Sequence, residues 1–270
     1  MRRAASKLTL VDFSPPRKNV SSAHMAPNTA RAREVDVWSI SCGPGNGIDF
    51  SAQLLSPDEQ ERAGRFHCEL DRTRFRLTHT ALRMILAQYV NVDPQELSFV
   101  SGIGAKPELA SRFRDTGIQF NLSHSSEMAL LAVAREALVG VDVEWINPEI
   151  AIGEIAERFF STAEIRALNA LPADERVEAF FSCWTRKEAY IKALGEGLSV
   201  PLDSFEVAFG SQRAAALVAV RANPAELSRW SMYDLKVPKG YKGALVVEGT
   251  THRIREFWWT PELAVEGNSL

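Results

Sequence analysis

Residues 181–197 read Phe-Ser-Cys-Trp-Thr-Arg-Lys-Glu-Ala-Tyr-Ile-Lys-Ala-Leu-Gly-Glu-Gly, and the rest of the chain is organised around this stretch. Its apolar residues repeat with a helical period, which predicts a helix with Glu188 and Lys192 one turn apart on its flank. Such a pair ordinarily stabilises an exposed helix by about 0.2–0.5 kcal/mol. On its own it predicts a surface ion pair and no chemistry.

A second acidic pair lies upstream, in residues 138–145, Leu-Val-Gly-Val-Asp-Val-Glu-Trp. The β-branched alternation predicts a strand in which Val141 and Val143 face the core while Asp142 and Glu144 share the opposite face. Two carboxylates in one space raise each other's pKa unless a cation lies between them, so the pair indicates a metal site. The alternative is an exposed strand face where the acids only keep the edge soluble.

Four motifs occur in order along the chain. They are Lys106-Pro107-Glu-Leu109, Phe120-Asn-Leu-Ser123-His124-Ser125, Gly140-Val-Asp142-Val-Glu144 and Trp184-x-x-Lys187-Glu188-Ala-x-x-Lys192-x-x-Gly195-x-Gly197. Together they resemble the signature of the 4'-phosphopantetheinyl transferases, in particular the larger, two-halved type that activates carrier proteins of secondary metabolism. The resemblance covers approximately residues 56–209.

The resemblance implies an α+β fold. Two similar halves would pack side by side with a pseudo-two-fold relation, each with a mostly antiparallel sheet and helices on one face, and the active site would lie between them. We expect an N-terminal half at 35–137 and a C-terminal half at 138–260, with a tail at 261–270. Residues 1–34 are rich in Pro, Ser, Ala and Arg and predict a flexible extension. A transit peptide is the alternative, which Pro15-Pro16 disfavours.

The activity that the resemblance implies is transfer of 4'-phosphopantetheine from coenzyme A to a serine of an apo acyl- or peptidyl-carrier protein, with release of 3',5'-ADP. Asp142, Glu144 and Glu188 would bind Mg²⁺, which suits oxygen ligands better than zinc does. Glu188 is the first candidate for the base that deprotonates the serine, directly or through a water, and Glu144 is the second. Lys192 would steady the departing phosphate.

The resemblance also implies residues that contact coenzyme A. They are Lys106, Pro107, Ser123, His124, Asp142 and Lys192, with Ser123-His124-Ser125 expected just past the end of a strand. Arg62 and Arg74 are added because a basic patch of the family lies there, although a solvated face is the alternative for these arginines. His79 lies on the apolar stripe of a predicted helix and is expected to be a packed core histidine.

Bulk composition supports a soluble, cytoplasmic protein that binds neither nucleic acid nor membrane, and we expect a monomer. Residues 1–34 carry a net charge of +5, which leaves −8 for the remainder of a chain whose net charge is −3. No apolar run approaches the length of a membrane span. The three cysteines show no paired framework, which indicates free thiols in a reducing compartment.

Two other functions remain open from the sequence. A magnesium-dependent phosphohydrolase would use the same three acids, and a coenzyme A- or carrier-binding module would keep the site without turnover. For a carrier partner, the sequence favours an apolar contact through Phe159 or Phe160, with Arg166 nearby. Trp184 and Gly195 are assigned to structure. The strands predicted after Pro201 are expected to be antiparallel, with Trp258-Trp259 packing at a domain edge.

Overall fold

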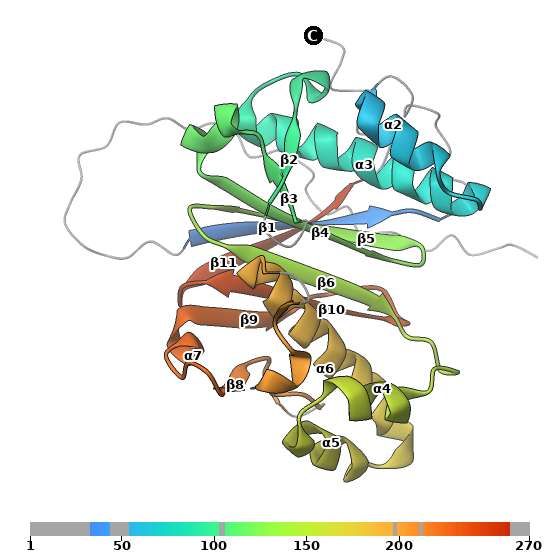
Figure 1. The fold of residues 1–270 in the computed structure, drawn as a ribbon, viewed down its shortest axis with the longest axis vertical. Helices are drawn as coiled ribbons and strands as arrows, with labels where there is room; N and C mark the ends of the chain where they lie inside the picture. The colour runs from blue at the N-terminus through green and yellow to red at the C-terminus, as the bar shows by residue number, and fades with distance from the viewer. Residues whose placement is uncertain (1–32, 44–53, 103–105, 197–198, 211–212, 260–270) are drawn as a thin grey trace, which may run out of the picture. The chain divides into compact units, whose positions relative to one another are not determined.

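The computed structural model describes residues 33–43, 54–102, 106–196, 199–210 and 213–259. The elements, drawn in Figure 1, are β1 (Arg33–Ser41), α2 (Pro57–Gly64), α3 (Glu69–Val90), η1 (Pro94–Glu96), β2 (Phe99–Ser101), β3 (Pro107–Leu109), η3 (Ser111–Thr116), β4 (Ile118–Ser125), β5 (Met128–Arg135), β6 (Val139–Trp145), α4 (Ile152–Phe159), α5 (Thr162–Asn169), α6 (Ala173–Leu194), η5 (Leu202–Ser204), β7 (Phe205–Val207), β8 (Leu217–Val220), α7 (Glu226–Arg229), β9 (Trp230–Asp234), β10 (Tyr241–Glu248) and β11 (His252–Trp259).

The first sheet has the strand order β11-β1-β5-β4, and α3 packs against it. The helical period seen in the sequence places Leu82, Ile85 and Leu86 of α3 in the core, where they join Ile40 and Leu131 of the sheet. The α2 helix begins with a reciprocal capping box formed by Ser56 and Glu59. This half of the molecule therefore has one helical layer on one face of its sheet.

The second sheet has the order β6-β10-β9, and α6 lies on it. Gly140 makes this packing close, because a Cβ at that position would lie 2.1 Å from the Ala189 carbonyl oxygen. Gly195 ends the helix in the left-handed conformation with φ +76°, as its position in the motif predicts. The close approach at Gly140 and the helix end at Gly195 thus place residues 188 and 192 next to β6.

A third apolar cluster joins the two sheets. Val35, Val37 and Leu130 of the first sheet pack with Val141 and Val143 of β6. The valines of β6 thus face the core, as the alternation predicts, and the neighbouring acids face the other way. The α+β class, the largely antiparallel sheets and the helices covering single faces are confirmed.

One of the strands after Pro201 departs from the expected antiparallel arrangement. β11 does not extend the second sheet antiparallel to its neighbours; it runs parallel to β1, with Val35 opposite Ile254. The physical reason is long-range: Arg255 of β11 donates two hydrogen bonds to the buried Asp36 of β1, at 2.6 and 2.8 Å. Trp259 is buried in the core of the first half, whereas Trp258 is exposed.

Two boundaries also differ from expectation. Arg33 and Glu34 belong to β1, while the rest of the expected extension and the tail at 261–270 lie outside the described residues. Ser123, His124 and Ser125 lie within β4 instead of beyond its end, since the strand continues to the tight turn before β5. The division into halves at 137/138 remains a proposal, because β11 returns to the first sheet.

Candidate functional site

Strands β4 and β6 meet through their polar side chains. Ser123 donates a hydrogen bond to Asp142 Oδ1 at 2.8 Å, and Ser125 donates one to Glu144 Oε2 at 2.8 Å. Because alternate residues of a strand share a face, one face of β4 presents both serines and one face of β6 presents both acids. The predicted pairing of Asp142 with Glu144 on one face is confirmed.

Lys192 reaches this place from the last turn of α6. Its Nζ donates to Asp142 Oδ1 at 2.6 Å and to Ser123 Oγ at 2.9 Å. Asp142 is only 2% exposed, and its Oδ2 is buried without a hydrogen-bond partner among the described residues. Burial raises the pKa of Asp142, against the opposing effects of Lys192 and Ser123. Lys192 thus supplies the positive charge that compensates the buried carboxylate of Asp142.

Glu188 and Glu144 share the same electrostatic environment. Burial, and then the charges of Asp142 and Glu144, raise the pKa of Glu188 to about 7, although Lys192 opposes the shift. The pKa of Glu144 is raised by burial and by Asp142, while hydrogen bonds from Ser125 and Trp184 oppose this. A carboxyl group whose pKa lies near neutrality can accept and release a proton in water at pH 7.

A divalent cation was predicted between these acids. Within the residues that the structure describes, no three His, Cys, Asp or Glu side chains converge closely enough to form a ready-made metal site. Mg²⁺ does not require one, because it usually binds through one or two carboxylates, waters and substrate phosphates. The unpartnered Oδ2 of Asp142 and the pKa values of Glu144 and Glu188, each raised by burial and by the charge of Asp142, fit a hard cation with oxygen ligands.

His124 reaches solvent beside this cluster. Its pKa is lowered, first by loss of hydration and then by the nearby charges of Lys192, His79 and Arg62. His79 is packed as expected: its ring stacks on Phe75 with centroids 4.0 Å apart. Lys192 and Arg62 thus bring positive charge close to the exposed His124 ring, an arrangement that suits phosphate groups.

The two arginines assigned by position have other partners in the structure. The Arg62 guanidinium lies over the Phe75 ring, 5.5 Å from its centroid. Arg74 lies 3.7 Å from Asp71 and 3.7 Å from Glu127, and its buried Nε has no partner among the described residues. Of the two arginines, only Arg62 lies close enough to His124 to lower the pKa of that ring. Contacts of either arginine with coenzyme A stay a prediction.

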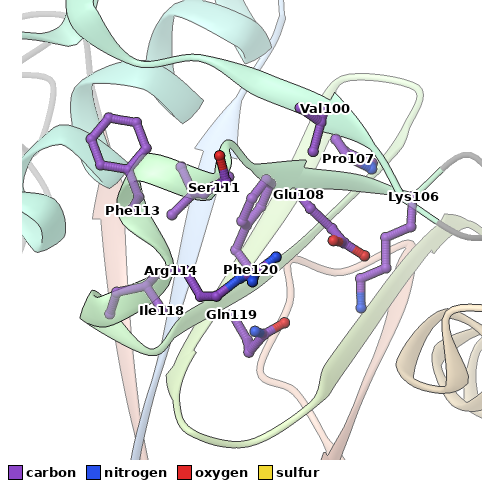
Figure 2. Close-up of a pocket in the computed structure, with 11 residues that line it drawn as sticks. Val100, Lys106, Pro107, Glu108, Ser111, Phe113, Arg114, Ile118, Gln119 and Phe120 are labelled. Carbon is purple, nitrogen blue, oxygen red and sulfur yellow. The ribbon is translucent and has the colours of Figure 1, made fainter.

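Lys106 and Pro107 line a pocket of about 240 Å³ between the β2–β3 hairpin, η3 and β4 (Figure 2). The ammonium group of Lys106 donates to two backbone carbonyls of the second half, those of Val139 at 2.8 Å and Lys192 at 2.9 Å. Burial lowers the pKa of Lys106 to about 8, with Glu108 opposing. The lysine therefore touches the last turn of the motif helix.

The sequence interpretation missed two partners of Glu144. Ser125 could have been found, because it lies two residues after Ser123 and so on the same strand face. Trp184, assigned to structure, does pack against Phe159 and Phe180, but its indole also lies close enough to Glu144 to lower the pKa of that carboxyl group. No local pattern reveals this proximity, since the two residues are forty positions apart.

One of the two phenylalanines expected to contact a carrier protein is buried. Phe160 is 3% exposed and stacks on Phe180, so it cannot offer the apolar contact proposed for a carrier, whereas Phe159 is half-buried.

Lys187 of the motif is fully buried and pairs with Glu164 at 2.8 Å, which fixes α6 to α5. The three cysteines are free, as predicted.

An ammonium, a hydroxyl and an imidazole thus lie beside three interacting carboxylates, a set of groups that can bind a phosphate ester and accept a proton. The 4'-phosphopantetheinyl transferase superfamily matches residues 138–246, and the 4'-phosphopantetheinyl transferase N-terminal family matches residues 45–136. The chain therefore belongs to the 4'-phosphopantetheinyl transferase superfamily and is an enzyme of that class.

Individual relatives agree. The 4'-phosphopantetheinyl transferase HetI of Nostoc sp. is 35% identical over 238 residues, covering 87% of this chain and 94% of the relative. The 4'-phosphopantetheinyl transferase gsp of Aneurinibacillus migulanus is 32% identical, covering 72% and 77%. Sfp of Bacillus subtilis is 34% identical, covering 57% and 66%. Among the described helices, none is long and apolar enough to cross a bilayer.

Proposed function

We propose that this enzyme transfers 4'-phosphopantetheine from coenzyme A to the serine of an apo acyl- or peptidyl-carrier protein. The observation that carries the proposal is the meeting of Lys192 and Ser123 at Asp142, next to Glu144 and Glu188. In the transfer, the serine oxygen forms a bond to the β-phosphorus, the bridging P–O bond breaks, and 3',5'-ADP leaves. The serine proton must go to a base.

Glu188 is the proposed base. With a pKa of about 7 it is partly deprotonated at neutral pH, and after accepting the proton it is neutral in a partly buried place. Glu144, held by Ser125, is the second candidate. Lys192 carries the positive charge that would stabilise the leaving phosphate, and Ser123 and His124 would orient the pyrophosphate by hydrogen bonds.

Magnesium belongs to the same proposal. Asp142, Glu144 and Glu188 would hold the ion, which when bound neutralises charge that develops on the pyrophosphate. Asp142→Ala is expected to weaken the dependence of initial rate on added Mg²⁺, and calorimetric titration with Mg²⁺ should show the same loss without turnover. An unchanged titration curve would remove Asp142 from the ligand set.

The remaining assignments are proposals of the same kind. Arg62, Arg74 and Pro107 would contact other parts of coenzyme A, whereas the ammonium group of Lys106 is held by two backbone carbonyls. The enzyme would act as a cytoplasmic monomer. Carriers of polyketide, peptide or fatty acid synthesis are the partners that the resemblance implies. Phe159 and the exposed Arg166 are candidate docking residues; a charge reversal at Arg166 that left carrier affinity unchanged would exclude its part.

The test is direct. The protein is incubated with coenzyme A, Mg²⁺ and a panel of apo-carriers, and each carrier is weighed by mass spectrometry. A mass gain of one phosphopantetheine supports the transferase. Labelled pantetheine released only into solution would indicate a phosphohydrolase, and retained coenzyme without turnover would indicate a binding module.

A further inference from the structure

The short hairpin of the first half is joined to the motif helix of the second by one side chain. Lys106 immediately precedes β3, and its Nζ lies 2.8 Å from Val139 O and 2.9 Å from Lys192 O. Val139 is the first residue of β6, which carries Asp142 and Glu144. Lys192 itself is in the last turn of α6, so one ammonium group bridges the two elements that carry the acidic cluster.

The carbonyl of Lys192 needs a donor from outside the helix. The last four carbonyls of an α-helix have no intrahelical partner, and here Gly195 N supplies Ile191 O at 3.2 Å. The next carbonyl, that of Lys192, accepts from Lys106 instead. A cation at this end also interacts favourably with the helix dipole. Lys106 thus acts as a helix cap that is supplied by another part of the fold.

The cap lies where a small shift of the helix end would change the position of Lys192. Beside it α6 contacts β6 without intervening side chains, because Gly140 approaches Ala189 O and Ala193 N too closely for any Cβ. The capped carbonyl belongs to Lys192 itself, and on the strand side only three positions separate Val139 from Asp142, whose Oδ1 lies 2.6 Å from Lys192 Nζ. A shift of the last turn would move Lys192 relative to Asp142 and Ser123.

We propose that Lys106 is a positioning residue, whose ammonium group fixes the last turn of α6 against the start of β6 and so sets where Lys192 points. This role rests on the proposed transfer reaction. It differs from a direct contact with coenzyme A, because it acts through the backbone of Lys192 and exists in the free enzyme.

Lys106→Met tests the role, since methionine keeps most of the length and apolar stem of lysine but donates no hydrogen bond. We expect kcat to fall by at least about tenfold, because a misplacement of about 1 Å can lower a rate by about 100-fold. The KM for coenzyme A should change far less. In hydrogen exchange, the Gly195 amide of the free enzyme should exchange faster than in the wild type. Lys106→Arg, which keeps donors, should recover part of kcat.

Lys239→Met is the matched control, since Lys239 is exposed and distant in sequence from the motifs. A Lys106→Met enzyme with raised KM, normal kcat and normal Gly195 exchange would overturn the proposal in favour of direct coenzyme binding. Normal values throughout would overturn it outright. If Lys106→Met does not fold, Lys106→Gln is measured in the same way. Failure of the transfer reaction itself would appear in the wild type, whereas the Gly195 exchange would still report on the cap.

Discussion

At the scale of single residues, the site is a balance between three carboxyl groups and one ammonium group. Asp142 is almost completely buried, and Lys192 is the cation that it contacts directly. Without that contact the buried charge would be uncompensated, which strongly disfavours the charged form. Burial, together with the charges of Asp142 and Glu144, raises the pKa of Glu188 to about 7. A substitution at any one of these four residues therefore changes the electrostatic environment of the other three.

Glu188→Gln should lower turnover by about 100-fold or more, because a positioned general base typically contributes about 10²–10⁴. The fold should be intact, since the side chain is only partly buried and makes no hydrogen bond with the part of the chain that the structure describes. Initial rates measured with an apo-carrier, together with a thermal melt, check both statements. A near-normal rate would reject Glu188 as the base and direct attention to Glu144.

Glu59 gives a prediction about stability. Burial would raise its pKa, but hydrogen bonds from His79, Ser56 and Arg83 and the charge of Arg83 outweigh this and lower it to about 2. A depressed carboxyl pKa contributes stability above the unfolded pKa, near 4.5, and that stability is lost as pH falls toward 2. Glu59→Gln should therefore flatten the loss of unfolding free energy between these pH values, measured by urea titration. An unchanged acid limb would contradict the assignment.

At the scale of elements, the contact between α6 and β6 decides whether the site exists. Gly140→Ala would place a Cβ 2.1 Å from Ala189 O and 2.3 Å from Ala193 N, both of which are backbone atoms. The helix must then move away from the strand, and we expect a loss of about 3 kcal/mol in unfolding free energy. Activity should fall further than stability, because Lys192 and Glu188 move with α6.

Gly153→Ala in α4 is the control for that substitution. No atom lies within 4 Å of a Cβ built there, and alanine favours helix over glycine. Unfolding in denaturant should show equal or slightly raised stability. If both alanine variants behaved alike, the close approach at Gly140 would not be the constraint that we describe.

At the scale of the whole molecule, the C-terminal strand closes the N-terminal sheet. Asp36, buried in β1, accepts two hydrogen bonds from Arg255 of β11 and one from Tyr89 of α3 at 2.5 Å. The last described strand, β11, therefore pairs with the first, β1. A division of the chain at residue 137 would separate β11 from the sheet to which it belongs. Stability of the first half depends on the last described strand.

Asp36→Ala should cost about 3 kcal/mol of unfolding free energy, because it removes the acceptor of a largely buried ion pair and leaves Tyr89 and Arg255 without it. Arg253→Ala serves as the control: its side chain is 72% exposed and lies 3.8 Å from Glu34, so about 0.5 kcal/mol or less is expected. Guanidinium unfolding curves measure both. Equal effects of the two substitutions would show that the Asp36 network does not hold β11 in place.

The local structure and the chemical identity of the site could be predicted from the order of the residues alone. Alternation placed Asp142 and Glu144 on one strand face, helical period placed Glu188 beside Lys192, and the ordered motifs indicated the family. Such features depend on neighbours a few residues apart, which a sequence displays directly.

Which distant groups meet became evident from the folded molecule. Four observations illustrate this. The tertiary structure joined Ser125 and Trp184 to Glu144, turned Lys106 onto the carbonyl of Lys192, buried Phe160, and placed β11 parallel to β1. Each of these contacts joins residues at least about twenty positions apart, except the burial of Phe160, which depends on where α6 lies. Long-range pairing is set by the packing of complete elements, and no local period encodes it.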